Sequence, residues 1–127
     1  MNRHVTVLRV EEGARFDPDR LEVLCSQFGE HRAEQLVAQS LDDITHHLAA
    51  LKASAQTVDL KAIAGPTQHL FDAADLIGMI SLKRVASDVL ECLDGSNDVA
   101  LAATLARLMR IGDQSILAVW DLEDLSG

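Results

Sequence analysis

Residues 59–82, DLKAIAGPTQHLFDAADLIGMISL, decide the fold of this chain. If residues 66–77 are helical, four apolar side chains share one stripe at the i, i+3, i+4, i+7 spacing of a buried face: Leu70, Ala73, Ala74 and Ile77. A turn of about 100° per residue directs Gln68 and Asp72 to the opposite side. The segment therefore offers an apolar face to other helices and a polar face to a partner. We expect the binding face to consist of Gln68, His69, Phe71, Asp72 and Asp75.

The composition excludes several classes of protein. A length of 127 residues favours one domain, and 48% hydrophobic residues are too many for a disordered chain. No apolar run approaches the ~18 residues of a membrane span. With 3% aromatic residues and no Tyr, the core must be built from Leu, Ala, Val and Ile, which is typical of helix-on-helix packing. The net charge of −9 argues against nucleic acid or anionic membrane as a partner, because both require a basic face.

The two cysteines indicate a reducing compartment. Cys25 and Cys92 lack the spacing of metal ligands, and no signal-like apolar segment opens the chain. We therefore expect a cytoplasmic protein with two buried thiols, in preference to a disulfide or redox pair.

Helical periodicity extends along most of the chain. Asp17 and Pro18 form a pairing typical of an N-cap and a first helical residue, and Gly29 predicts a stop. The longest apolar stripe, or seam, recurs at intervals of 4, 3, 4, 3 and 4 residues. Its members are Val37, Leu41, Ile44, Leu48, Leu51 and Ala55. Together the patterns predict helices over 17–28, 31–55, 66–77, 81–94 and 98–120.

Three positions interrupt these patterns. Pro66 lacks an N–H group and crowds the carbonyl of Ala62, which predicts a kink or a fresh helix start at Pro66. Ser81 is the expected cap of the helix that follows. Gly112 falls on the apolar stripe of the last helix. It is either a weak point of that helix or a place where a neighbouring helix comes close.

The predicted fold is all-α. Short loops favour antiparallel neighbours, so residues 16–121 are expected to form an up-and-down antiparallel four-helix bundle with a short preceding helix. Residues 1–15 would be an extended N-terminal arm, lying on the body or on a second copy, and 122–127 a C-terminal tail. The expected core comprises Leu41, Ile44, Leu48, Leu70, Ile77, Leu105, Leu108 and Ile116.

Two adjacent histidines form the one arrangement that suggests a metal. His46 and His47 follow Asp42 and Asp43 by one turn. These side chains would diverge around the helix and no second cluster completes them, so we interpret them as surface histidines, with His46 exposed and His47 beside the seam. Neither a metal nor another cofactor is expected.

The 59–82 segment resembles the histidine-containing phosphotransfer (Hpt) domain of bacterial phosphorelays. That family is a four-helix bundle that exchanges a phosphoryl group with the aspartate of receiver domains. Its motif is a histidine with Leu or Ile at +2, Lys at +3, Gly at +4 and +10, Leu four residues later, and an acidic residue nine before. Four residues agree with this motif in one ungapped register: Asp59, Leu70, Gly78 and Leu82.

The same register places Gln68 in the slot of the phosphorylated histidine. Phe71 replaces the lysine, Asp72 replaces the first glycine, and His69 falls one residue late. Glutamine cannot carry a phosphoramidate, and a carboxylate one turn away repels a phosphoryl group that carries about two charges. The departures all oppose phosphotransfer.

Three functions follow from this resemblance. The first is a binding module that has lost the chemistry and meets a receiver domain or a histidine kinase on the face defined above. The second is an active phosphotransfer protein that uses His69 as an alternative phosphoacceptor. The third is a structural or homodimeric helical bundle that shares only the architecture. No hydrolase or oxidoreductase site is expected, because no nucleophile, base and orienting group converge.

Overall fold

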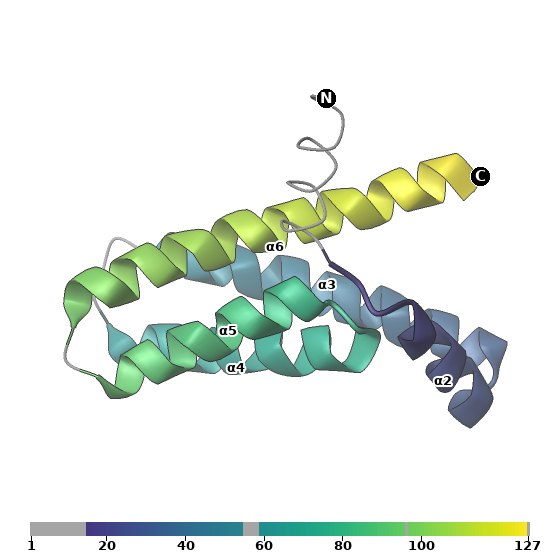
Figure 1. Cartoon of the computed structure of the whole chain (residues 1–127), viewed down its shortest axis with the longest axis horizontal. Coiled ribbons are helices and arrows are strands. Elements are labelled where there is room, and N and C mark those ends of the chain that lie inside the picture. The colour runs from purple at the N-terminus through teal and green to yellow at the C-terminus, as the bar shows by residue number, and fades with distance from the viewer. Residues whose placement is uncertain (1–14, 55–58, 96, 127) are drawn as a thin grey trace, which may run out of the picture.

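The computed structural model describes residues 15–54, 59–95 and 97–126, with side chains described up to residue 119. Within these ranges the chain contains α-helices and no β-strand, which confirms the all-α prediction. The helices are α2 (Pro18–Phe28), α3 (Glu30–Ser54), α4 (Leu60–Ile77), α5 (Ile80–Asp94) and α6 (Asp98–Ser126). Each helix packs against the next in the sequence, and α6 also contacts α3 (Figure 1).

Local capping explains where the helices begin and end. The Asp17 carboxylate accepts a hydrogen bond from the backbone N–H of Asp19, and Pro18 is the first residue of α2, as predicted. Gly29 ends α2 at a φ of 84°, a conformation that glycine adopts without steric cost. At the start of α4, the Asp59 carboxylate caps the N–H of Lys61 in the same way.

The prediction of a helix starting at Pro66 is wrong, because α4 starts at Leu60 and continues through the proline. The residue before Pro66 is glycine, which has no Cβ to clash with the proline ring in a helical conformation. In the same turn, the Thr67 hydroxyl donates a 2.7 Å hydrogen bond to the carbonyl of Ile63. The strong cap at Asp59 adds to these effects, so the helix tolerates the missing N–H.

Gly78 forms the turn between α4 and α5. It has the left-handed backbone conformation, with φ 78° and ψ 28°, and its N–H bonds to the carbonyl of Ala74. A Cβ at this position would lie 2.8 Å from Cβ of Arg20, so packing as well as conformation requires glycine. The N-cap of α5 is Met79, so the prediction that Ser81 caps this helix is wrong. Ser81 is instead buried in the first turn of α5.

The segment before α2 is tied to this turn. The N–H of Asp17 donates to the carbonyl of Gly78 at 2.8 Å, and the N–H of Ile80 donates to the carbonyl of Arg15 at 2.9 Å. An isolated antiparallel bridge joins Phe16 and Met79 between them. These bonds fix α2 and its lead-in against the α4–α5 turn. The predicted arm over residues 1–15 lies outside the described residues except for Arg15.

The core is aliphatic and joins α3, α4, α5 and α6. Five of the eight predicted core residues are buried, namely Ile44, Leu48, Leu70, Leu105 and Leu108. The other three, Leu41, Ile77 and Ile116, are only half-buried at its margin. Ser40 takes the buried position on α3 that Leu41 was expected to fill. Ile77 is the last residue of α4, and Ile116 lies in the C-terminal half of α6.

Further predictions from the sequence concern the two cysteines, Gly112, the end of α6 and membrane spans. Cys25 and Cys92 are free thiols, but both are half-buried and not buried. Gly112 marks a close approach of α6 to α3, since a Cβ there would lie 2.6 Å from a Leu48 methyl carbon. The helix α6 continues to Ser126 instead of ending at residue 120. In the described ranges, no helix combines the length and the apolar character that crossing a membrane requires.

Candidate functional site

The candidate site is the outward side of α4. Its buried side consists of Thr67, Leu70, Ala73 and Ala74, which anchor the helix to the core. On the outward side Gln68, His69, Asp72 and Asp75 are exposed, and Phe71 is half-buried. The five residues of the predicted binding face therefore share one surface.

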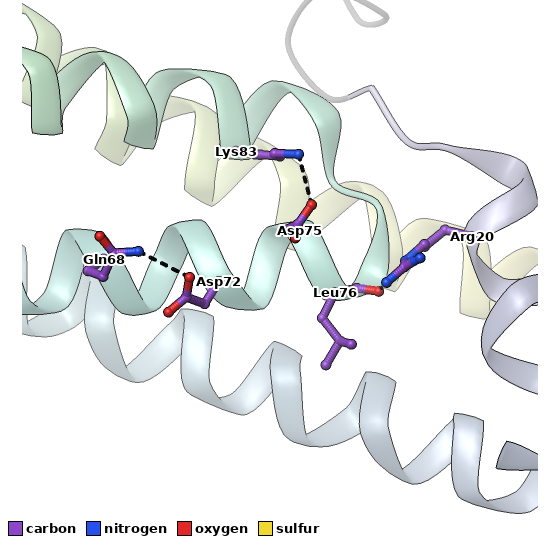
Figure 2. A network of polar contacts seen from close by, with 6 residues as sticks. All are labelled: Arg20, Gln68, Asp72, Asp75, Leu76 and Lys83. Carbon is purple, nitrogen blue, oxygen red and sulfur yellow. Dashed lines mark hydrogen bonds and ion pairs between the residues drawn. The ribbon is translucent and has the colours of Figure 1, made fainter. Parts of the chain in front are cut away.

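Gln68 and Asp72 interact with each other along the helix. The side-chain amide of Gln68 donates to a carboxylate oxygen of Asp72 at 3.1 Å, one helical turn away (Figure 2). The contact is exposed, so it contributes only a few tenths of a kcal/mol, about 0.2–0.5. The two side chains together present an exposed amide with a carboxylate beside it.

A lysine from the next helix reaches the other end of this face. Lys83 on α5 places its Nζ 2.8 Å from a carboxylate oxygen of Asp75 and 5.7 Å from the centre of the Phe71 ring. Figure 2 shows the lysine extending from α5 across to α4. Both charged side chains are about half exposed, so the pair adds at most about 1 kcal/mol to stability. It does balance one of the two carboxylates on the face.

His69 lies against a histidine of α3. The rings of His69 and His47 stack almost in parallel, with centroids 4.6 Å apart and an angle of 7° between the planes. One face of the His69 ring is therefore covered although the residue as a whole is exposed. The stack explains how the ring contacts a neighbouring helix while the residue as a whole stays exposed.

The environment of His47 disfavours its charged form. Burial lowers the pKa of this imidazole below its ordinary value, and the neighbouring His69 and His46 lower it further. Asp43 acts in the opposite direction and raises the pKa. The edge-on contact of His46 with His47, at 5.2 Å between centroids, places a third imidazole in this group.

A shallow pocket adjoins the histidine stack between α3 and α4. Its volume is about 210 Å3, and its lining residues are Ser40, Asp43, His47, His69, Asp72, Ala73 and Leu76. In the part of the chain that the structure describes, no three His, Cys, Asp or Glu side chains are arranged to hold a metal ion. One member of each pair in the sequence, Asp43 and His47, thus contributes to the wall of a polar pocket.

A second pocket, of about 260 Å3, opens at the α4–α5 turn beside Asp75 and Lys83. Arg20 of α2 lines it and donates from Nε to the carbonyl of Leu76 at 2.8 Å (Figure 2). This bond satisfies a carbonyl in the last turn of α4, where intrahelical partners are missing. The end of the binding face is thereby held in place by α2.

Sequence reasoning missed two contributors to this surface. It assigned no role to Lys83, and it did not connect His47 with His69. The missing signal is the symmetry of antiparallel helix pairs, in which residues at similar distances from a turn become neighbours. Asp75 and Lys83 flank the turn at Gly78, and the two histidines flank the connection between α3 and α4 in the same manner.

Comparison with known proteins provides no further guide to function. No family model, no curated protein and no solved structure matches this chain.

Proposed function

We propose that the chain is an Hpt-like four-helix bundle that binds a receiver domain or a histidine kinase without carrying a phosphoryl group. The partner would meet the outward side of α4, at Gln68, His69, Phe71, Asp72 and Asp75. The observation that supports this proposal is the exposed Gln68 side chain, which bonds to Asp72 and which the family resemblance assigns to the phosphoacceptor position. An amide offers no nucleophile for phosphoryl transfer.

The residues that carry the family resemblance all have structural tasks in this fold. Asp59 caps α4, and Gly78 provides the left-handed residue that ends it. Leu70 and Leu82 are completely buried. The motif positions that are kept thus support the architecture, and the positions that have changed all lie on the outward face. This division is what a bundle retained for binding would show.

Lys83 gives the proposed face a positive charge despite the loss of lysine at position 71. Its ammonium group lies above Phe71, close to the place where the family motif has its own lysine. The face therefore presents a cation, two carboxylates and an aromatic edge together. A partner with complementary charges could use these groups without any covalent step.

Titration of the 15N-labelled protein with purified receiver domains and histidine kinases tests the binding proposal. We expect amide shifts concentrated on residues 68–75 of α4, and weaker binding after Phe71→Ala. Val99→Ala is the matched control, since Val99 is an apolar residue with 80% exposure on α6. Equal effects of the two variants, or no binding by any partner, would overturn the proposal in favour of a structural bundle.

His69 supports a second candidate function, an active phosphotransfer protein. It is exposed on the same face and follows Gln68 directly. Incubation with a phosphorylated receiver separates the two functions. Acid-labile phosphate on the wild-type chain that disappears in His69→Ala, but persists in His31→Ala, would establish the active protein.

A further inference from the structure

Three arginines from separate parts of the chain surround one small pocket. Arg15 precedes α2, Arg84 lies on α5 and Arg107 lies on α6. The pocket has a volume of about 160 Å3, and its remaining lining residues are Ser81, Val85 and Ile111. These three are buried, so they form the floor, whereas the arginines are exposed around the rim. None of the residues of the α4 binding face takes part.

The three guanidinium groups have no counter-charge among the described residues. The ion pairs found there are Lys52 with Asp113 and Asp75 with Lys83, and neither includes an arginine. The chain has 20 acidic residues and a net charge of −9, so carboxylates are abundant. Arg84 even has an aspartate four residues later on the same helix, yet no ion pair joins them. Among the described residues, none of the three arginines therefore lies within ion-pair distance of a carboxylate.

Such a cluster has an electrostatic cost without a ligand and a benefit with one. Like charges repel at close range, and an anion between them converts the repulsion into attraction. Arginine is suited to this task, since its planar guanidinium donates paired hydrogen bonds that match phosphate and carboxylate oxygens. The pocket also lies at the first turn of α5, where the helix dipole favours negative charge.

The backbone holds the three arginines on firm supports. The carbonyl of Arg15 accepts from the N–H of Ile80, and the N–H of Arg15 donates to the Ser81 hydroxyl at 3.1 Å. Figure 1 shows this lead-in to α2 meeting the first turn of α5. Arg84 and Arg107 are carried by adjacent, packed helices. The framework is therefore in place before a ligand arrives, which reduces the entropic cost of binding.

We propose that this pocket binds a phosphate group, as inorganic phosphate or as the end group of a phosphate monoester. The volume favours a small anion, because pockets for drug-sized ligands measure roughly 300–1,000 Å3. Three arginine forks match the several oxygens of a phosphate dianion better than the two oxygens of a carboxylate. The site is separate from the α4 face, so it does not depend on the function proposed above.

Side-chain NMR of the intact protein tests this proposal. Arginine Nε–H signals are recorded during titration with inorganic phosphate, with glycerol phosphate as a monoester and with acetate, all at constant ionic strength. We expect saturable shifts at Arg15, Arg84 and Arg107 with phosphate or the monoester. Whichever of the two compounds binds more tightly shows whether the pocket takes free phosphate or a phosphate monoester. Preference for acetate, or shifts that never saturate, would overturn the proposal.

Variants separate the pocket from general electrostatic attraction. Arg84→Gln and Arg107→Gln should each weaken phosphate binding roughly tenfold, the effect of losing one charge-assisted hydrogen bond. Arg84→Lys keeps the charge but not the planar fork, and should lie between Arg84→Gln and the wild type. Arg110→Gln is the matched control, because Arg110 is an exposed arginine on α6 that does not line the pocket. If Arg110→Gln weakens binding as much as Arg107→Gln, the pocket is not the site. The substituted side chains are all exposed, and circular dichroism verifies that the variant proteins fold.

Discussion

Gly112 of α6 faces the side chain of Leu48 of α3 so closely that a Cβ on the glycine would lie 2.6 and 2.7 Å from the two leucine methyl carbons. Leu48 is almost completely buried, so its side chain has little space into which it can turn. The absence of a side chain at residue 112 therefore determines how near α6 comes to α3. The glycine is costly for the helix and necessary for its packing.

This relationship predicts that the effect of Gly112→Ala on stability changes sign when Leu48 is truncated to alanine. Gly112→Ala alone should destabilise the protein, because overpacking costs about 1–3 kcal/mol and exceeds the gain of up to about 1 kcal/mol in helix propensity. Leu48→Ala alone should cost about 2–5 kcal/mol. In the Leu48→Ala background, Gly112→Ala should become stabilising. Urea denaturation of the four proteins measures the coupling, and additive effects would contradict the packing argument.

Leucines on the two sides of α6 should differ sharply in their contribution to stability. Leu108 is completely buried, whereas Leu117 on the same helix is 62% exposed. Leu108→Ala should lower the free energy of unfolding by about 2–5 kcal/mol. Leu117→Ala should change it by at most about 0.5 kcal/mol. A loss below about 1 kcal/mol for Leu108→Ala would mean that the apolar seam does not face a well-packed core.

The histidine stack predicts a dependence of stability on pH. The folded state lowers the pKa of His47, so the unfolded chain binds more protons below about pH 6.5, the ordinary value for histidine. This group therefore costs no stability above that pH and destabilises the fold as the pH drops through its lowered pKa. Unfolding measured at several pH values between about 8 and 5 should show the loss.

Two variants assign that pH dependence to the stack. His47→Gln should reduce the loss of stability between neutral and mildly acidic pH, whereas His31→Gln, a change at an exposed histidine of α3, should not. In the wild-type chain, proton NMR should place the pKa of His47 below its ordinary value, and His69→Ala should raise it. An unchanged pKa in His69→Ala would show that the two rings do not interact.

If Gln68 occupies the phosphoacceptor position, as the proposed function implies, a histidine introduced there should produce phosphotransfer. Gln68→His provides the nucleophile, and Asp72→Gly removes the adjacent carboxylate, so the double variant should accept label from a phosphorylated receiver. Adding Phe71→Lys supplies the motif's own cation, yet it brings that cation close to Lys83. We therefore expect the triple variant to gain little over the double variant.

The same assay has an internal comparison. Gln68→His alone should accept less label than the double variant, because Asp72 still repels the incoming phosphoryl group. A single variant as active as the double variant would show that the carboxylate at residue 72 is not an obstacle. Activity that disappears with His69→Ala in every background would place the phosphoacceptor one residue later.

The sequence predicted those parts of the structure that are determined by local chemistry. The cap at Asp17, the stop at Gly29 and the outward position of Gln68 all follow from spacing or from single residues. The path through Pro66 was not predictable from the proline alone. The residue before it is glycine, which lacks the Cβ that disfavours the helical conformation ahead of a proline.

The parts that the sequence did not reveal arise from contacts between helices. Lys83 joins the α4 face only because α5 folds back along α4, and the arginine pocket gathers residues that are distant in sequence. The burial of Ser40 in place of Leu41 reflects how α3 is rotated against its neighbours. Periodicity defines an apolar stripe, but packing decides which edge of that stripe is covered.

The bonds that tie the lead-in of α2 to the α4–α5 turn have a consequence for the order of folding. Contacts between successive helices join residues that are close in sequence, so helical hairpins can form early at small entropic cost. The Arg15–Ser81 and Arg20–Leu76 hydrogen bonds span 66 and 56 residues and close long loops. We expect them to form after the hairpins and to open first. Amide protons at Asp17 and Ile80 should then exchange with solvent sooner than those in the middle of α6, and the N-terminal segment would detach from a bundle that is otherwise intact.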